Sequence, residues 1–275
     1  MVYSAKRFLY IFFTILCWGL SYPLSKIALS YMTPIILAFI RSFIGGLILM
    51  LFVRKIISGR KEFIDALLNV GALLILLNLG IYFSLNPGLA SVMLYTQPVF
   101  TIIISSIFLK EPIMKKELLG VVLAFSGILI SVNSLEFDYG VLFALLGGFI
   151  WSVGTIYHSK HFKNTELLSL HTFMSLVSSV FIVPLIPIGF YFIFSLKGIL
   201  VALALTILAQ VFGYIAWFKS INEIGPIMSG TFSLLVPVMA YITTYLILGI
   251  KPSLLTLIGS AVTLFGVFFA MRSHK

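Results

Sequence analysis

The 275-residue sequence has little charge, a single cysteine and few carboxylates. Charged residues make up 9% of the chain and hydrophobic residues 61%, whereas soluble proteins carry about 25% charged residues. A chain of this composition cannot build a surface that faces water, so soluble, disordered and fibrous classes are excluded. Because Cys17 is the only cysteine, an intramolecular disulfide, a Cys-x-x-Cys redox pair and a cysteine zinc cluster are also excluded.

The sequence also lacks the motifs of enzymes and of nucleotide-driven pumps. It has no Gly-x-x-x-x-Gly-Lys-Ser/Thr loop, no Gly-x-Ser-x-Gly, no His-Glu-x-x-His and no aspartate pair within an apolar run. We therefore expect no enzyme activity, no catalytic residue, no metal site and no cofactor. The net charge of +10 also occurs in nucleic-acid-binding proteins, but here the basic residues lie in short segments between apolar runs, so no nucleic-acid partner is expected.

What the sequence does contain is a series of apolar runs, each close to the roughly 20 residues that a helix needs to span a bilayer. Strand-type alternation is absent from these runs, and helices satisfy their own backbone groups in lipid, so each run is predicted to be a transmembrane helix. The seventh run contains Pro184 and Pro187 and is expected to kink or end early. The ten predicted helices cover residues 8–29, 34–53, 66–85, 88–109, 118–135, 139–158, 167–194, 198–218, 226–249 and 253–271.

The distribution of Lys and Arg predicts how these helices are oriented. If the N-terminus lies in the cytoplasm, fourteen basic residues fall in cytoplasmic segments and three, Lys26, Lys197 and Lys251, fall on the opposite side. Cytoplasmic loops carry an excess of Lys and Arg. We therefore expect a multi-pass protein of the plasma membrane, surrounded by membrane lipid, with both termini in the cytoplasm.

The chain also repeats itself. The matched pairs are Trp18 and Trp151, 133 residues apart; Asn78 and Gln210, and Tyr82 and Tyr214, 132 apart; and Pro98 and Pro237, Gly120 and Gly259, and Gly127 and Gly266, 139 apart. Such consistent offsets indicate two copies of one five-helix unit, residues 1–135 and 136–275. Because five is odd, the second copy must enter the membrane from the opposite side. The sequence therefore predicts an all-α integral membrane protein whose ten transmembrane helices form two inverted five-helix repeats, an architecture typical of secondary transporters.

A set of motifs in the same order resembles the EamA-type family of the drug/metabolite transporter superfamily, over about residues 8–271. The motifs are Trp18-Gly19, Ser21, Pro23, Lys26, Pro34, Arg41, Pro98, Lys110-Glu111-Pro112, Gly120 and Gly127 in the first half, and Trp151, Pro237, Gly259 and Gly266 in the second. The resemblance implies a ten-helix carrier, often an exporter of amino acids or related small solutes. One position departs from the family pattern, since Ile250 stands where the second half often repeats the acidic residue that matches Glu111.

The leading hypothesis is a secondary transporter that exports small metabolites such as amino acids by alternating access, with a central pocket between the repeats. Carriers of amines, drugs or nucleosides, and a multi-span membrane partner or assembly protein that transports nothing, are the alternatives. The eight carboxylates lie at or near the ends of the runs, so no mid-span proton relay is evident and the coupling ion stays open.

Several polar and aromatic residues are candidates for binding the small-molecule solute. Asn78 and Tyr82 are four residues apart, as are Gln210 and Tyr214, so each pair shares a helical face. Trp217 extends the second of these faces, and Tyr95 adds a phenol from the fourth helix. An amide, a phenol and an indole suit a solute with a polar end and an apolar body. The alternative for the amides is hydrogen bonding between helices.

A second group is predicted to act in gating or structure. Trp18 and Trp151 lie mid-helix rather than in interfacial belts, and Tyr22 follows Trp18 by one turn. Pro98 and Pro237 each remove an intrahelical hydrogen bond and free a carbonyl, as in the broken helices of transporters. Arg41, about two turns into its helix, is expected to be structural or gating, with binding of a substrate carboxylate as an alternative.

Small residues form matching stripes on the fifth and tenth helices. The stripes are Gly120, Ala124, Gly127 and Ser131, and Gly259, Thr263, Gly266 and Ala270. Such stripes permit close approach of two helices. We expect the two stripes to pack within the monomer, which is the favoured state, with a homodimer seam as the alternative.

Overall fold

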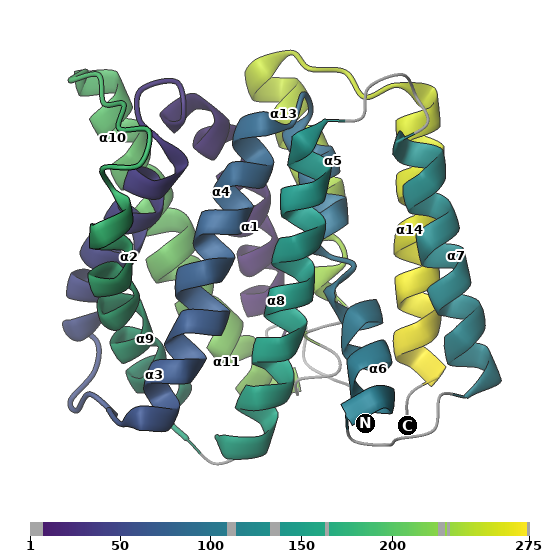
Figure 1. Ribbon diagram of the computed structural model, residues 1–275, viewed down its shortest axis with the longest axis horizontal. Helices are drawn as coiled ribbons and strands as arrows, with labels where there is room; N and C mark the ends of the chain where they lie inside the picture. The colour runs from purple at the N-terminus through teal and green to yellow at the C-terminus, as the bar shows by residue number, and fades with distance from the viewer. Residues whose placement is uncertain are drawn as a thin grey trace.

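The computed structural model describes residues 8–108, 114–132, 138–162, 165–224, 229 and 232–273 (Figure 1). In this part of the chain the regular structure is helical, apart from an isolated bridge between Met32 and Phe192. The helices form ten stretches, which confirms the predicted all-α class. Six stretches are long and apolar enough to cross a membrane, and three more are shorter apolar helices.

The helices lie close to the predicted runs. They are α1 (Leu9–Ala28), α2 (Pro34–Met50), α3 (Arg60–Ala66) continued by a π-helical segment (Leu67–Ala72) and α4 (Leu73–Phe83), α5 (Pro87–Leu94), α6 (Gln97–Phe108), α7 (Lys115–Val132), α8 (Tyr139–His161), α9 (Leu167–Ile182) with a 3₁₀ turn (Val183–Leu185), α10 (Leu196–Leu205) continued by a second π-helical segment (Thr206–Gly213) and α11 (Tyr214–Ile224), α13 (Val236–Leu248) and α14 (Leu254–Ser273).

Local sequence explains where several helices begin. Thr33, Asn86 and Asp138 precede α2, α5 and α8, and each accepts a hydrogen bond from a backbone N–H of the first turn. Such caps satisfy donors that have no partner within the helix. At α2 and α5 the cap is followed by proline. Proline has no backbone N–H, so it needs no hydrogen-bond acceptor in the first turn, where none is available within the helix.

The seventh stretch ends before its predicted limit of residue 194. Regular helix stops at Ile182, the 3₁₀ turn follows to Leu185, and Gly189 has a positive φ of 60°. Pro184 and Pro187 account for this early end because proline cannot donate to the helical ladder. The extended segment beyond pairs with the turn before α2, where the Ile193 N–H donates to the Tyr31 carbonyl at 2.7 Å.

Two helices are interrupted at equivalent positions in the two halves. The fourth stretch breaks at Tyr95 and Thr96, just before α6, and a turn at Leu234 and Leu235 precedes α13. Pro98 and Pro237 are the second residues of the helices that follow, where a missing N–H is tolerated. The π-helical segments begin at positions with the same separation of 139 residues. Each half therefore contains one π-helical segment and one proline-linked break.

The small-residue stripes of α7 and α14 pack against each other within the chain. These two helices stand side by side at one edge of the bundle (Figure 1). A Cβ atom added at Gly127 would lie 2.4 Å from the Thr263 backbone nitrogen, and one at Gly266 would lie 2.4 Å from that of Ala124. The close approach of the two backbones therefore requires glycine at both positions, as the stripes predicted.

The ends of the helices define two faces of the bundle. At the lower face in Figure 1, α8 ends and α9 begins, and at the upper face α4 ends and α5 begins. The helix α1 begins at the lower face, where α14 also ends. Within the bundle α1 contacts α4, α5, α10, α11 and α13.

Candidate functional site

A cavity of about 360 Å³ lies inside the bundle, in the half nearer the lower face. His158 near the end of α8, Leu167 at the start of α9 and Ile221 near the end of α11 place it there. Ligand pockets in proteins typically measure about 300–1,000 Å³, so this cavity has room for a small solute. Its lining residues are Trp18, Asn69, Tyr95, Gln97, Pro98, Trp151, Thr155, His158, Leu167, Leu170, His171, Met174, Tyr214, Trp217, Phe218, Ile221, Ser233 and Leu234.

Aromatic rings make up much of the cavity wall. The chain has three tryptophans, Trp18, Trp151 and Trp217, and all three line the cavity. The ring centroid of Trp18 lies 5.4 Å from that of Tyr214, and the Tyr95 and Trp151 centroids are 5.8 Å apart. Both pairs adopt edge-to-face geometry, which aromatic rings favour. The cavity thus offers flat apolar surfaces to the body of a solute.

The π-helical segment before α11 helps to fix this wall. The Trp18 indole N–H donates to the Ala209 carbonyl at 3.2 Å, and Ala209 lies within that segment. The Tyr214 ring, one residue after the segment, stacks on His171 with centroids 3.8 Å apart. π-helical turns occur frequently at functional sites. The orientations of Trp18 and Tyr214 are therefore set by contacts that join α1, α9 and α11.

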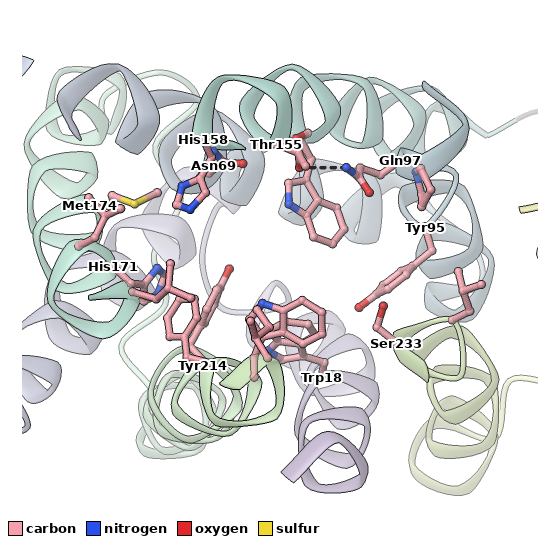
Figure 2. A pocket seen from close by; sticks show the side chains of 18 residues that line it. Trp18, Asn69, Tyr95, Gln97, Thr155, His158, His171, Met174, Tyr214 and Ser233 are labelled. Atoms are coloured by element: carbon pink, nitrogen blue, oxygen red, sulfur yellow. Dashed lines mark hydrogen bonds between the residues drawn. The ribbon is translucent and has the colours of Figure 1, made fainter. Parts of the chain in front are cut away.

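Polar groups are few and lie in part across the cavity from the aromatic wall. Figure 2 shows Trp18 and Tyr214 on one side and Gln97, Thr155 and His158 on the other. The Gln97 side-chain amide donates to the Thr155 hydroxyl at 2.9 Å, which joins α6 to α8. No Lys, Arg, Asp or Glu lines the cavity among the residues that the structure describes.

A buried carboxylate lies behind the polar side and was not predicted as part of a site. Asp65 on α3 is fully buried, and its carboxylate lies 2.7 Å from the His158 Nδ1 atom. The Asn69 amide donates to the same carboxylate at 2.6 Å. Asp65 thereby positions two residues of the cavity wall. Asp65 lies directly before a predicted span, and this position could have marked it as a candidate. Its partner His158 lies 93 residues away in the sequence, so the contact between the two could not be inferred.

Asn78 and Gln210 do not line the cavity, in contrast to the prediction. Both side chains are fully buried between helices. The Asn78 amide donates to the Pro34 carbonyl at 3.2 Å, and the Gln210 amide lies 3.2 Å from both the His171 Nε2 atom and the Ser175 hydroxyl. The amides therefore link α4 to α2 and the second π-helical segment to α9, which is the alternative of hydrogen bonding between helices.

Tyr82 also lies outside the cavity, with 45% of its surface exposed. Asn78 bonds to Pro34, the first residue of α2, so one turn further along α4 the side chain of Tyr82 has passed the end of that neighbouring helix. Sharing a helical face with Asn78 therefore does not bury it. Pro237 lies at the start of α13 and does not line the cavity either. Of the other predicted residues, Tyr22 and Arg41 do not line it, whereas the remaining six do: Tyr95, Tyr214, Trp217, Trp18, Trp151 and Pro98.

A smaller cavity of about 50 Å³ lies next to the main one. Four aromatic residues, Trp18, Tyr95, Trp151 and Tyr214, line both cavities and are called the aromatic collar below. Beyond the collar the smaller cavity is lined by Ser21, Tyr22, Arg41, Leu73, Leu74, Leu77 and Leu94. Arg41 is 3% exposed, and its Nη1 atom donates to the Asn78 side-chain oxygen at 3.5 Å.

The fold and the site together define a class of protein. An all-helical bundle with several membrane-spanning helices that encloses an aromatic, solute-sized cavity is typical of membrane carriers. The EamA-like transporter family matches this chain twice, over residues 6–133 and 138–272. The chain therefore belongs to the EamA-like transporter family. It is a multi-pass membrane transporter and not an enzyme.

Two curated relatives match along nearly their full length. An uncharacterized transporter of Archaeoglobus fulgidus is 27% identical over 98% of this chain and 100% of its own. A probable amino-acid metabolite efflux pump of Escherichia coli K12 is 26% identical over 95% of this chain and 94% of its own. A solved crystal structure aligns with a TM-score of 0.70 and 15% identity, covering 99% of this chain and 100% of the other, which shows a common fold.

Proposed function

We propose that the protein is a secondary transporter that exports small metabolites such as amino acids from the cell by alternating access. The observation that carries this proposal is the aromatic cavity inside the bundle, lined by every tryptophan of the chain. The proposal that the solute is a metabolite such as an amino acid is supported by the relative in E. coli, which is named as a probable amino-acid metabolite efflux pump.

The arrangement of the two halves supports alternating access between inverted repeats. Each half contributes one π-helical segment and one proline-linked break, at positions 139 residues apart. With both termini in the cytoplasm, as the Lys and Arg distribution predicts, the lower face is cytoplasmic and the main cavity lies in the cytoplasmic half. This is the state in which an exporter would load its solute.

Contacts near the upper face support a closed outer side in this state. The Lys26 ammonium donates to the Ile81 and Tyr82 carbonyls at 3.0 and 2.9 Å, which joins the end of α1 to the end of α4. Midway along both helices, the Thr243 hydroxyl also donates to the Gly19 carbonyl at 3.0 Å and joins α13 to α1. Release of the solute to the outside would require at least the first of these contacts to open.

The residues proposed to contact the solute are Tyr95, Tyr214 and Trp217. Trp18 and Trp151, which the sequence predicts to act in gating or structure, are included with them. All five line the main cavity. Asn78 and Gln210 are proposed to hold the helices in register, because their hydrogen bonds run between helices.

Two tyrosines of the predicted site supply a pair of variants to test this proposal. Tyr214 lines the cavity, whereas Tyr82 lies outside it and is exposed. In proteoliposomes, Tyr214→Ala is expected to lower the flux of the transported amino acid about tenfold or more, equivalent to about 1.4 kcal/mol of lost interaction. Tyr82→Ala is expected to leave flux near the wild-type value.

Protein abundance is measured for both variants in the same membranes. Equal loss of flux and abundance in Tyr214→Ala would indicate a packing role. If the wild-type protein moves no compound in a panel of amino acids, amines, drugs and nucleosides, the proposal fails in favour of a membrane partner that transports nothing.

A further inference from the structure

We propose that Arg41 forms an anion subsite, behind the aromatic collar, that receives the carboxylate of the transported solute. The solute class is then a small carboxylate with an aromatic or apolar body. This inference rests on the proposed transport function and assigns its substrate chemistry. It favours the alternative of carboxylate binding over the structural or gating role expected for Arg41 from its sequence position.

The first support is the unfilled hydrogen-bonding capacity of a buried charge. A guanidinium stays protonated in proteins and has five N–H donors. Arg41 has one described acceptor, the Asn78 side-chain oxygen, at 3.5 Å, which is beyond the usual range of a strong hydrogen bond. Its Nε atom is buried and has no hydrogen-bond partner. No residue that the structure describes forms an ion pair with Arg41.

The second support is energetic. A charge removed from water and left without a counter-charge costs several kcal/mol, so buried arginines with a purely structural role are normally paired. A carboxylate is the ligand that best satisfies a guanidinium, because its two oxygens accept two parallel N–H bonds. The unmet capacity of Arg41 therefore points to an anion that arrives from outside the protein.

The third support is the position of the guanidinium relative to the solute site. Arg41 lines the smaller cavity, and the four residues of the aromatic collar line both cavities. A solute whose body lies against the collar can therefore place one end in the main cavity and the other toward Arg41. The smaller cavity, at about 50 Å³, suits a polar group of a few atoms and not a whole solute.

The charges around the two cavities favour carboxylates over amines. Among the described lining residues Arg41 is the one Lys or Arg, and neither Asp nor Glu lines either cavity. An ammonium group would meet aromatic faces but no carboxylate in either lining, because Asp65 lies behind the wall and is held by His158 and Asn69. It would also be repelled by Arg41. Among the solute classes considered from the sequence, amino acids and other carboxylates therefore fit the site better than amines.

The tryptophans provide a direct assay, because every one of them lines the main cavity. We would titrate the purified wild-type protein in lipid nanodiscs, and record tryptophan fluorescence with phenylalanine, 3-phenylpropionate, phenylalaninamide and phenethylamine as probes. These probes share a benzyl body and do not absorb at the wavelength that excites tryptophan selectively. The two carboxylates are expected to bind about tenfold to a hundredfold more tightly than the two amines, which is the range for hydrogen bonds to a charged group.

Variants then assign this preference to Arg41. Arg41→Gln is expected to abolish the preference for carboxylates, and Arg41→Lys to retain part of it. Lys251→Gln is the control, because it removes the same charge at an exposed position outside both cavities. Since the four probes are compared first on the wild-type protein, the inference stays testable even if Arg41→Gln fails to fold.

Three results would overturn the inference. The first is equal binding of phenylalanine and phenethylamine by the wild type, and the second is wild-type affinity for 3-phenylpropionate in a folded Arg41→Gln variant. The third is no fluorescence response to any probe while the flux assay detects transport of another solute, in which case the transporter proposal stands and the carboxylate subsite alone fails.

Discussion

Asp65 shows how one buried side chain can organise a site that it does not line. Its carboxylate receives the Asn69 amide and contacts His158, and both of these partners line the main cavity. Removing a buried acceptor leaves its partners unsatisfied, which costs about 1–3 kcal/mol per group. The contact between Asp65 and His158 also joins α3 to α8, so removing the Asp65 carboxylate would destabilise the packing of both helices.

We therefore predict that Asp65→Ala lowers the apparent melting temperature of the purified protein, through a loss of about 1–3 kcal/mol of stability. Asp65→Asn is expected to lose less, because it keeps an acceptor oxygen. Glu166→Ala is the control, since Glu166 is exposed and its side chain makes no cap hydrogen bond at the start of α9. A melting temperature for Asp65→Ala equal to that of Glu166→Ala would contradict the prediction.

At the scale of helices, the close contact of α7 and α14 depends on glycine. A methyl group at position 127 would lie 2.4 Å from a backbone nitrogen of α14, and backbone cannot rotate away as a side chain can. Overpacking of this kind costs about 1–3 kcal/mol. Gly127→Ala is therefore expected to lower the yield of folded protein and its apparent melting temperature.

A second glycine provides the comparison for this prediction. A methyl group at Gly71, in the first π-helical segment, would meet its nearest neighbour, the Ser178 hydroxyl oxygen, at 3.4 Å, an ordinary contact distance. Gly71→Ala should therefore be tolerated. If the two variants melt at the same temperature in thermal-shift measurements, α7 and α14 are not as closely packed as the structure indicates.

At the scale of the whole molecule, the contacts of Lys26 are expected to hold the outer side closed. Lys26→Met removes the bonds from the end of α1 to the Ile81 and Tyr82 carbonyls. We predict that this change shifts the population toward a state open to the outside, because it destabilises only the state in which those bonds exist.

The shift can be measured with a cysteine at position 21, which lines the smaller cavity, in a Cys17→Ala background. An impermeant thiol reagent added outside intact cells should label Ser21→Cys severalfold faster when Lys26→Met is also present. Lys197→Met, an exposed lysine on the same predicted side, serves as control. Unchanged labelling would argue against a gate at Lys26, and faster labelling from the cytoplasmic side would reverse the predicted orientation.

Local sequence was sufficient to predict the helices and their interruptions. Ten apolar runs gave ten helical stretches, Pro184 and Pro187 marked an early end, and Pro98 and Pro237 marked two breaks. These features depend on residues close together in the chain, namely on enough apolar length and on the absence of a proline N–H. The predicted residues Tyr95, Tyr214 and Trp217 line the main cavity, and their binding of the solute stays a prediction.

The packing of the bundle sets which side of each helix meets the cavity and which side meets another helix. Helical periodicity groups Asn78 with Tyr82 and Gln210 with Tyr214, but of these four only Tyr214 reaches the cavity. The sequence likewise does not show that Asp65 contacts His158, because the two residues lie on different helices. Nor does it show that Arg41 lies behind the aromatic collar, because the collar residues come from other helices. A repeat of 3.6 residues defines faces of a helix, whereas the neighbour of each face is set by how the whole bundle packs.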